Sequence, residues 1–257
     1  MVLSLAQLEV FFFILGRIGG VFIQAPLFNS RSFFASAKVA LVVWIALLLW
    51  FVTPVTPVLP TTPVGFVLAL VAEVAVGFLI GFVANILFVA LQSAGEMIDL
   101  QMGLSVAQAL DPVFGAVISI IGRLTFFVSL IVFITLDGHH LLLAALHQSF
   151  SLLPAGQIAN FATPAIPEQL AGLAATLWLT AIKIAAPIVL LIFLSDFTFG
   201  IVSRVAPQVN VFMLGFQVKP ILGLFGLSLL APFIVKYISK LIEVIGYEVL
   251  KLLVAIK

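Results

Sequence analysis

The sequence predicts an all-α protein that crosses a membrane several times, and three observations lead to that fold class. Hydrophobic residues make up 64% of the 257 residues and charged residues only 8%, and the mean hydropathy is +1.37. Soluble domains are roughly 45–50% apolar and about 25% charged. The apolar residues are gathered into runs, and the connections between the runs carry glycine, proline and polar residues. This combination is typical of a polytopic membrane protein or of a subunit of a membrane complex.

The apolar runs predict the helices. A helix needs about 20 residues to cross the hydrocarbon core, so some runs are long enough and others are short unless their flanks extend them. We therefore expect several helices to pack against protein instead of lipid. The runs cover residues 8–27, 39–52, 64–91, 113–136, 141–153, 170–194 and 221–235.

The first run carries Arg17 in its middle, and the only basic group before it is the amine of Met1. A cleaved signal peptide has a positively charged start followed by an uninterrupted apolar stretch. We therefore expect this run to be retained as a helix. Pro187 and Pro232 fall inside later runs, where a proline is expected to kink or break the helix.

The charges of the connecting segments give conflicting evidence on topology. Residues 29–38 are basic and are predicted to be cytoplasmic, whereas the uncharged, proline-rich residues 53–63 are predicted to be external. Residues 195–220 are basic again, which fits the same rule only if residues 141–153 are re-entrant. Residues 92–111 contain acids and no base, so the rule does not support the cytoplasmic side that simple alternation gives them. A regular zigzag through the membrane therefore fits badly.

The tail, residues 236–257, predicts an amphipathic helix because its apolar residues recur at helical spacing. An interfacial or solvated polar face and a groove for a specific partner both remain open for it. The apolar stripe consists of Ile238, Leu241, Ile242, Ile245, Val249, Leu252, Leu253 and Ile256.

The stretch from Gly77 to Pro112 organises the rest of the chain. Its apolar helix is expected to give way, from Gln92 to Asp111, to a polar loop punctuated by glycine. Irregular backbone between two membrane helices is tolerated only where protein or water surrounds it. A rigid packing loop and a movable element are both open for this segment.

Four ionisable residues lie inside apolar runs: Arg17, Glu73, Arg123 and Lys183. Each costs about 2.5–3.5 kcal/mol at the centre of a membrane helix, so all four are expected to face protein, water or one another. Three bases cannot be neutralised by one acid. We therefore expect some of the four to contact other subunits, with burial or snorkelling without a function as the alternative.

Two pairs of small residues, Gly16 with Gly20 and Gly77 with Gly81, have the spacing that lets another helix approach closely. Such pairs also arise by chance in a sequence of this composition, so a real packing face is one of two interpretations.

Catalytic and metal-binding patterns are absent from the sequence. There is no cysteine, no HExxH, no phosphate-binding glycine loop with a lysine and no nucleophile motif. Glu96 and Asp99 are three residues apart, and His139, His140 and His147 are near one another, so a metal or acid–base site is an alternative that the missing motifs disfavour. The segment Asp137-Gly138-His139-His140 is expected to be a polar turn. A proton relay through Asp137, His140 and His147 remains a minor alternative. We expect neither an enzyme nor a resident metal or cofactor, and the net charge of +1 indicates no nucleic-acid partner.

The chain resembles the FliR family of the flagellar type III export gate, which is homologous to the T-type component of virulence injectisomes. The resemblance covers nearly the whole chain and depends on the order of several motifs. These are the segment 94–103 (AGEMIDLQMG) followed by Asp111-Pro112, then Gly138-His139-His140, Ser149-Phe150 with Pro154, the Pro187 helix ending at Asp196, and residues 204–212 (RVAPQVNVF). Residues 215–219 (GFQVK) resemble the flagellar branch more than the injectisome branch.

The resemblance implies a non-enzymatic pore subunit in the bacterial inner membrane, at the flagellar basal body. It implies a FliP-like helical portion over about residues 1–165 and a FliQ-like helical hairpin over about residues 166–257. The implied partners are FliP-like and FliQ-like subunits, FlhB-like and FlhA-like export components, and the unfolded polypeptides that are exported.

The resemblance also implies two functional segments. Residues 92–111 correspond to the loop that plugs the closed pore, and residues 195–220 correspond to a turn near an FlhB-like partner. The plug residues are Gly95, Met97, Leu100, Met102, Gly103, Leu104, Val106 and Leu110. The partner-contact residues are Arg204, Gln208, Asn210 and Lys219.

Three other functions were weighed. The first is a T-type subunit of an injectisome. A secondary transporter or ion-conducting protein is the second, but no inverted repeat pairs two broken helices. The third is a membrane enzyme, which the lack of clustered catalytic groups disfavours.

Overall fold

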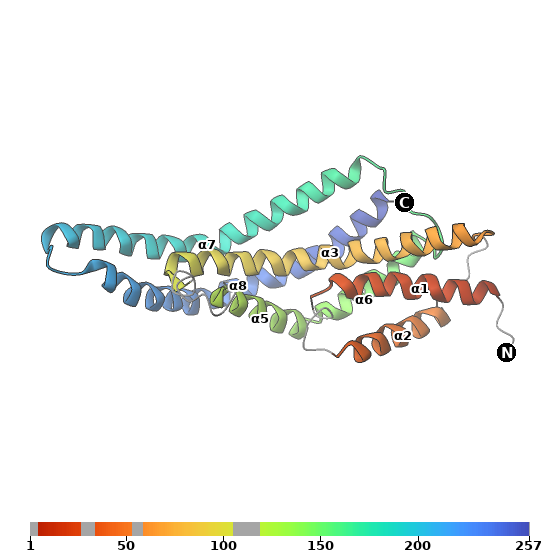
Figure 1. Ribbon diagram of the computed structural model, residues 1–257, viewed down its shortest axis with the longest axis horizontal. Helices are drawn as coiled ribbons and strands as arrows, with labels where there is room; N and C mark the ends of the chain where they lie inside the picture. Colours follow the sequence, from red (N-terminus) through yellow and green to blue (C-terminus); the bar gives the residue numbers. More distant parts are fainter. Residues whose placement is uncertain (1–4, 27–33, 53–58, 105–118, 257) are drawn as a thin grey trace. The chain divides into compact units, whose positions relative to one another are not determined.

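The computed structural model describes residues 5–26, 34–52, 59–104 and 119–256, and all regular structure in these ranges is α-helical (Figure 1). The predicted all-α fold class is therefore confirmed. Five helices (α1, α2, α3, α7 and α8) are long and apolar enough to cross a membrane, and α5 with α6 forms a broken span or a re-entrant segment. The helices are α1 (Leu5–Gln24), α2 (Ala35–Val52), α3 (Pro63–Met102), α5 (Ile120–Thr135), α6 (Gly138–Leu152), α7 (Ala165–Val205) and α8 (Val211–Ala255).

The expectation that a loop begins at Gln92 is wrong, because α3 continues without interruption to Met102. Gly95 shows the physical reason. A Cβ built on it would lie 2.7 Å from the Cα of Gly122 in α5, so this glycine permits close helix packing instead of loosening the backbone. The packing offsets the roughly 1 kcal/mol that a glycine costs inside a helix. Residues 105–111 lie outside the described ranges.

The connection expected over residues 195–220 is also mostly helical. Helix α7 extends to Val205 and α8 begins at Val211, so residues 206–210 form the whole turn between them. Helix α8 also joins the last apolar run to the predicted tail helix. Asn210 caps the start of α8 at the end of this turn.

Pro187 lies inside α7, and Pro220 and Pro232 lie inside α8, yet neither helix ends at a proline. Of the two expected outcomes, a break does not occur at Pro187 or Pro232, and a kink at either residue stays a prediction. A proline removes one intrahelical hydrogen bond, and membrane helices tolerate that loss where neighbouring groups satisfy the freed carbonyl.

The chain folds into two compact units, each described here by itself. Helices α3, α7 and α8 are long enough to contribute residues to both. The first unit consists of residues 1–87, 137–173 and 242–257, and the second of residues 88–136 and 174–241.

In the first unit, α1 and α3 pack through the two predicted glycine pairs. A Cβ on Gly77 would overlap the carbonyl oxygen of Arg17, and a Cβ on Gly20 would lie 2.7 Å from the backbone nitrogen of Phe78. Gly81 likewise faces the backbone of Val21. Backbone cannot move aside as a flexible side chain can, so these positions accept only glycine without a shift of a helix. The prediction of a close packing face is confirmed, and the two pairs face each other.

Arg17 and Glu73 form a buried ion pair between these two helices, with Nε of Arg17 2.6 Å from Oε2 of Glu73. The side chains are 0% and 1% exposed. Arg17 also donates to Oγ of Ser149 at 3.0 Å and to the carbonyl of Leu153 at 2.9 Å. Oε1 of Glu73 accepts from the backbone N–H of Gly156 at 2.8 Å.

The expectation that the ionisable residues face protein, water or one another is therefore confirmed for Arg17 and Glu73, which pair with each other and do not supply the subunit contacts for which they were candidates. The sequence shows how many charges lie in apolar runs, but it does not show that two residues so far apart in the chain form an ion pair. Arg123 and Lys183 are exposed, and neither side chain makes an ion pair or hydrogen bond with any described residue.

The C-terminal part of α8 buries the stripe predicted for the tail. Seven of its eight residues are buried and Leu241 is half-buried. The end of the helix is fixed by bonds to its last carbonyls: Oγ1 of Thr163 donates to Ala255 at 2.9 Å, and the N–H of Asn160 donates to Ile256 at 2.9 Å. The predicted amphipathic helix is confirmed as the final segment of α8.

We expect Gly20→Ala to lower the thermal unfolding temperature and the amount of folded protein in membranes, because its Cβ would meet backbone atoms of α3. Overpacking of this kind costs about 1–3 kcal/mol. Gly19→Ala is the matched control, because a Cβ on Gly19 meets nothing within 4 Å. Equal melting temperatures for the two variants would contradict the packing assigned here.

We expect Arg17→Leu and Glu73→Leu each to destabilise the chain by about 3–5 kcal/mol, because each leaves an uncompensated buried charge. The double variant is expected to recover much of this loss, since no charge then remains buried. Arg123→Leu serves as an exposed control. A double-mutant cycle on thermal unfolding in detergent measures the coupling, and additive single effects would be incompatible with the buried pair.

Candidate functional site

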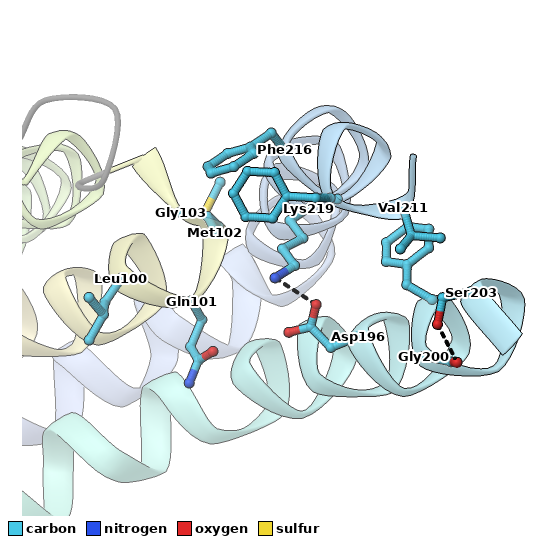
Figure 2. A pocket seen from close by; sticks show the side chains of 13 residues that line it. Leu100, Gln101, Met102, Gly103, Asp196, Gly200, Ser203, Val211, Phe216 and Lys219 are labelled. Atoms are coloured by element: carbon cyan, nitrogen blue, oxygen red, sulfur yellow. Dashed lines mark hydrogen bonds and ion pairs between the residues drawn. The ribbon is translucent and has the colours of Figure 1, made fainter. Parts of the chain in front are cut away.

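The second unit contains a pocket of about 390 Å³ where the end of α3 meets the α7–α8 hairpin (Figure 2). Its walls are mainly apolar and aromatic, and its charged groups lie on α7 and α8. The lining residues are Leu100, Gln101, Met102 and Gly103 from α3 and its end, Asp196, Phe199, Gly200 and Ser203 from α7, and Val211, Phe212, Gly215, Phe216 and Lys219 from α8. The pocket thus brings part of the predicted plug segment together with part of the predicted partner-contact segment.

Helix α3 ends at the pocket because Gly103 adopts a left-handed conformation, with φ of 79°. Its N–H donates to the carbonyl of Asp99 at 3.1 Å, which satisfies one of the last carbonyls of the helix. A Cβ on Gly103 would lie 3.4 Å from the ring of Phe216. Gly103 is therefore both the helix terminator and a point of close approach to α8.

Met102 anchors the end of α3 against α8. Its side chain is fully buried, and a Cβ on Gly223 would lie 2.6 Å from its Sδ. Glycine at position 223 thus makes room for the thioether, whose unbranched chain fits irregular spaces. Leu100, two residues earlier, is 64% exposed at the pocket.

Lys219 and Asp196 form an ion pair across the pocket, with Nζ 2.6 Å from Oδ1 (Figure 2). The pair joins α8 to α7, and the two side chains are 25% and 40% exposed. At this exposure the pair contributes up to about 1 kcal/mol, so it sets the register of the hairpin more than its stability. Sequence reasoning assigned Lys219 to a partner and gave Asp196 no role, whereas the structure pairs the two within the chain.

The other three predicted contact residues are exposed, Arg204 at the end of α7 and Gln208 and Asn210 in the turn between α7 and α8. The side chains of Arg204 and Gln208 make no ion pair or hydrogen bond with the part of the chain that the structure describes. Asn210 has a structural role that the sequence reasoning missed, because its Oδ1 accepts from the N–H of Met213 at 3.2 Å and caps α8. An asparagine just before an apolar helix was the available signal.

The remaining plug candidates are distributed differently. Gly95 is buried in the contact of α3 with α5, Met97 is half-buried, and Leu104 is half-buried after the end of α3. Val106 and Leu110 lie outside the described residues. The described part of the segment therefore supplies Leu100, Met102 and Gly103 to the pocket.

Asp99 has a role for which the sequence gives no signal. It is 1% exposed, and its Oδ1 accepts from the N–H of Ile121 at 3.1 Å, at the first turn of α5. A carboxylate is favoured at the positive end of a helix dipole. Glu96 instead is exposed and accepts from Nε2 of Gln92 at 2.9 Å. The two acids do not form a joint acid–base site.

A second group of polar residues lies in the first unit, at the start of α6. Asp137, His139 and His140 each place one potential ligand atom within 4.8 Å of the others. Asp137 Oδ1 lies 3.2 Å from Nδ1 of His140. His147 is not part of this group, so the alternative relay through Asp137, His140 and His147 is not assembled.

Comparison with known proteins gives a consistent family. Residues 8–245 match the model of the family described as Bacterial export proteins, family 1. The chain is 33% identical over 227 residues to the flagellar biosynthetic protein FliR of Pectobacterium carotovorum. The aligned region covers 87% of this chain and 85% of that protein. It is 31% identical over 204 residues to FliR of Bacillus subtilis, covering 79% and 78%. It is also 36% identical over 151 residues to the Yop proteins translocation protein T of Yersinia pestis, covering 57% and 56%.

We expect Gly103→Ala to destabilise the end of α3, because a Cβ is disfavoured at a positive φ by about 1–2 kcal/mol. Gly103→Asn is expected to cost less, since asparagine tolerates the left-handed region. Comparing the two variants by thermal unfolding of the full chain separates backbone strain from contact with Phe216. A larger loss for asparagine than for alanine would show that space, and not backbone conformation, restricts this position.

Proposed function

Because the chain belongs to family 1 of the bacterial export proteins, we propose that it is a non-enzymatic, pore-forming subunit of the flagellar type III export gate. It joins FliP-like and FliQ-like subunits in the inner membrane at the flagellar basal body, and the assembly passes unfolded flagellar substrates. The observation that carries the proposal is the match to proteins named FliR over most of both chains. The flagellar relatives match over a larger share of the chain than the injectisome relative, so the T-type injectisome subunit is the second candidate.

The exposed surfaces support a subunit role. Of the whole of α2, only Ala46 is buried, and α7 and α8 expose many large apolar side chains. Lys183 lies well inside α7, exposed and without a described partner. A lysine facing lipid at the centre of a membrane helix costs about 2.5–3.5 kcal/mol, whereas a carboxylate or carbonyl of another subunit offsets that cost. These features suit a chain that completes its packing inside a complex.

The non-enzymatic part of the proposal rests on the arrangement of the polar groups. Within the described ranges, Arg17 and Glu73 form an ion pair with each other, and Asp99 caps a helix. Apart from its one ion pair, the pocket in the second unit is lined by apolar and small residues and by Gln101. Such a surface can bind and guide a polypeptide but offers no nucleophile with a base.

In the proposed gate, residues 92–111 act together with the pocket to close the pore at rest. Residues 92–102 are the helical, fixed part of this segment. Gly103 is the point at which the chain after α3 can change direction. The apolar seal consists of Leu100, Met102, Leu104, Val106 and Leu110. Gly95 and Met97 lie in the fixed helical part. Methionine suits a seal because it repacks around irregular shapes.

We expect replacement of residues 104–110 by glycine and serine, at equal length, to leave the complex assembled but to make the membrane leak small ions. The replacement keeps Met102 and Gly103, on which the contact with α8 depends. Ion conductance and recovery of the intact complex are measured in one strain. Gly172→Ala, at an α7 position outside the pocket where a Cβ meets nothing within 4 Å, is the control for assembly. Normal assembly with no added conductance would refute the plug.

Arg204 and Gln208 are proposed to meet an FlhB-like export component, with Asn210 shaping the turn and Lys219 holding it to α7. We expect a photo-crosslinking residue at Gln208 to capture that component in cells. The same residue at Gln157, exposed in the first unit, is the control. Capture of lipid alone at Gln208, or equal capture at both positions, would count against this contact.

A further inference from the structure

The start of α6 combines three side chains with the chemistry of a metal site. Asp137 is the N-cap residue, and Gly138 separates it from the adjacent pair His139 and His140. Imidazole nitrogens and carboxylate oxygens are the ligands used by Zn²⁺ and related transition-metal ions. The potential ligand atoms of the three residues lie within 4.8 Å of one another. We infer that Asp137, His139 and His140 form a binding site for a divalent transition-metal ion of the Zn²⁺ type.

The measured separations fit such an ion. Two ligand atoms on a tetrahedral ion with bonds of about 2.0–2.1 Å lie roughly 3.3 Å apart. Oδ1 of Asp137 and Nδ1 of His140 are 3.2 Å apart. The rings of His139 and His140 lie beside each other, with centroids 4.2 Å apart and planes inclined by 39°. A small rotation of two largely exposed side chains brings the third ligand into range.

Two features of the site are not explained by a simple turn. Asp137 holds a left-handed φ of 55°, yet its carboxylate makes no capping bond to α6 and turns to His140 instead. Nδ1 of His139 is buried and has no hydrogen-bond partner among the described residues. Buried polar atoms are almost always bonded, so an unpaired buried nitrogen on one of the three candidate ligands is consistent with an ion or water bound to it. Both features point to a ligand held between the three side chains.

The setting also predicts what kind of site this is. Three protein ligands leave at least one position for water, as in open zinc sites, and not the closed four-ligand set of structural zinc. The positive end of the α6 dipole disfavours a cation, and the Asp137 carboxylate at the same place offsets that effect. We therefore expect a single ion of moderate affinity that fastens Asp137 to the first turn of α6.

The sequence provides an internal control for the test. The chain has no cysteine and three histidines, two of which are in the cluster, so His147 is the remaining imidazole. His147 is exposed on the same helix and outside the group. The full chain is purified in detergent through a cleavable tag without histidine, and Co²⁺ is added as an optical probe that Zn²⁺ then displaces.

We expect one Co²⁺ per chain with a ligand-field spectrum typical of nitrogen and oxygen ligands. Asp137→Asn and His140→Gln are each expected to weaken binding by roughly tenfold or more, while His147→Gln leaves it unchanged. Added Zn²⁺ is expected to raise the melting temperature of the wild type and of His147→Gln, but not of the cluster variants. Asparagine tolerates the left-handed conformation, so Asp137→Asn tests the ligand without straining the backbone.

Three results would overturn the site. They are unchanged affinity in both cluster variants, an equal loss of affinity in His147→Gln, and binding of an adventitious ion only, at millimolar concentration. Retained elution volume and helical circular dichroism establish that each variant is folded. The outcome does not depend on the export function, because metal binding is read from the chain itself.

Discussion

The buried pair of Arg17 and Glu73 is the interaction on which the first unit depends. Two charges that are 0% and 1% exposed persist only if every donor and acceptor is used, because burial of an unpaired charge costs several kcal/mol. The guanidinium therefore binds Ser149 and the carbonyl of Leu153, and the carboxylate binds the N–H of Gly156. This requirement fixes α1, α3, α6 and the segment after α6 in one arrangement.

Close packing of glycine makes that arrangement possible. In the α1–α3 contact, Gly20 and Gly77 each lie against backbone atoms of the other helix. Only at this close approach are Arg17 and Glu73 within bonding distance. The second unit uses the same device where Gly95 faces Gly122, and where Gly223 makes room for Met102. Small residues thus decide which helices touch, and polar groups decide in which register they do so.

The features left over by internal packing are the ones that the proposed function uses. Arg17 and Glu73 are paired within the chain and Asp99 accepts from the N–H of Ile121, whereas Lys183 and Arg204 face outward without described partners for their side chains. The exposed apolar surface of α2, α7 and α8 needs lipid or protein to cover it. A gate subunit would be expected to separate its charges in this way, into those that hold its own fold and those available to neighbours.

The sequence by itself determined the fold class, the apolar stripe of the C-terminal segment, the glycine packing faces and the family. The first three depend on composition and on spacing within one helix, which the chain carries locally, and the family is indicated by the order of motifs along the chain. Only the tertiary structure decided that Glu73 is the partner of Arg17, that Asp99 caps α5, that Asp196 holds Lys219, and that α3 continues past Gln92. The reason is physical: each of these depends on a contact between residues distant in the chain, or on packing that overrides the local preference of a glycine, and neither is encoded in the spacing of neighbours.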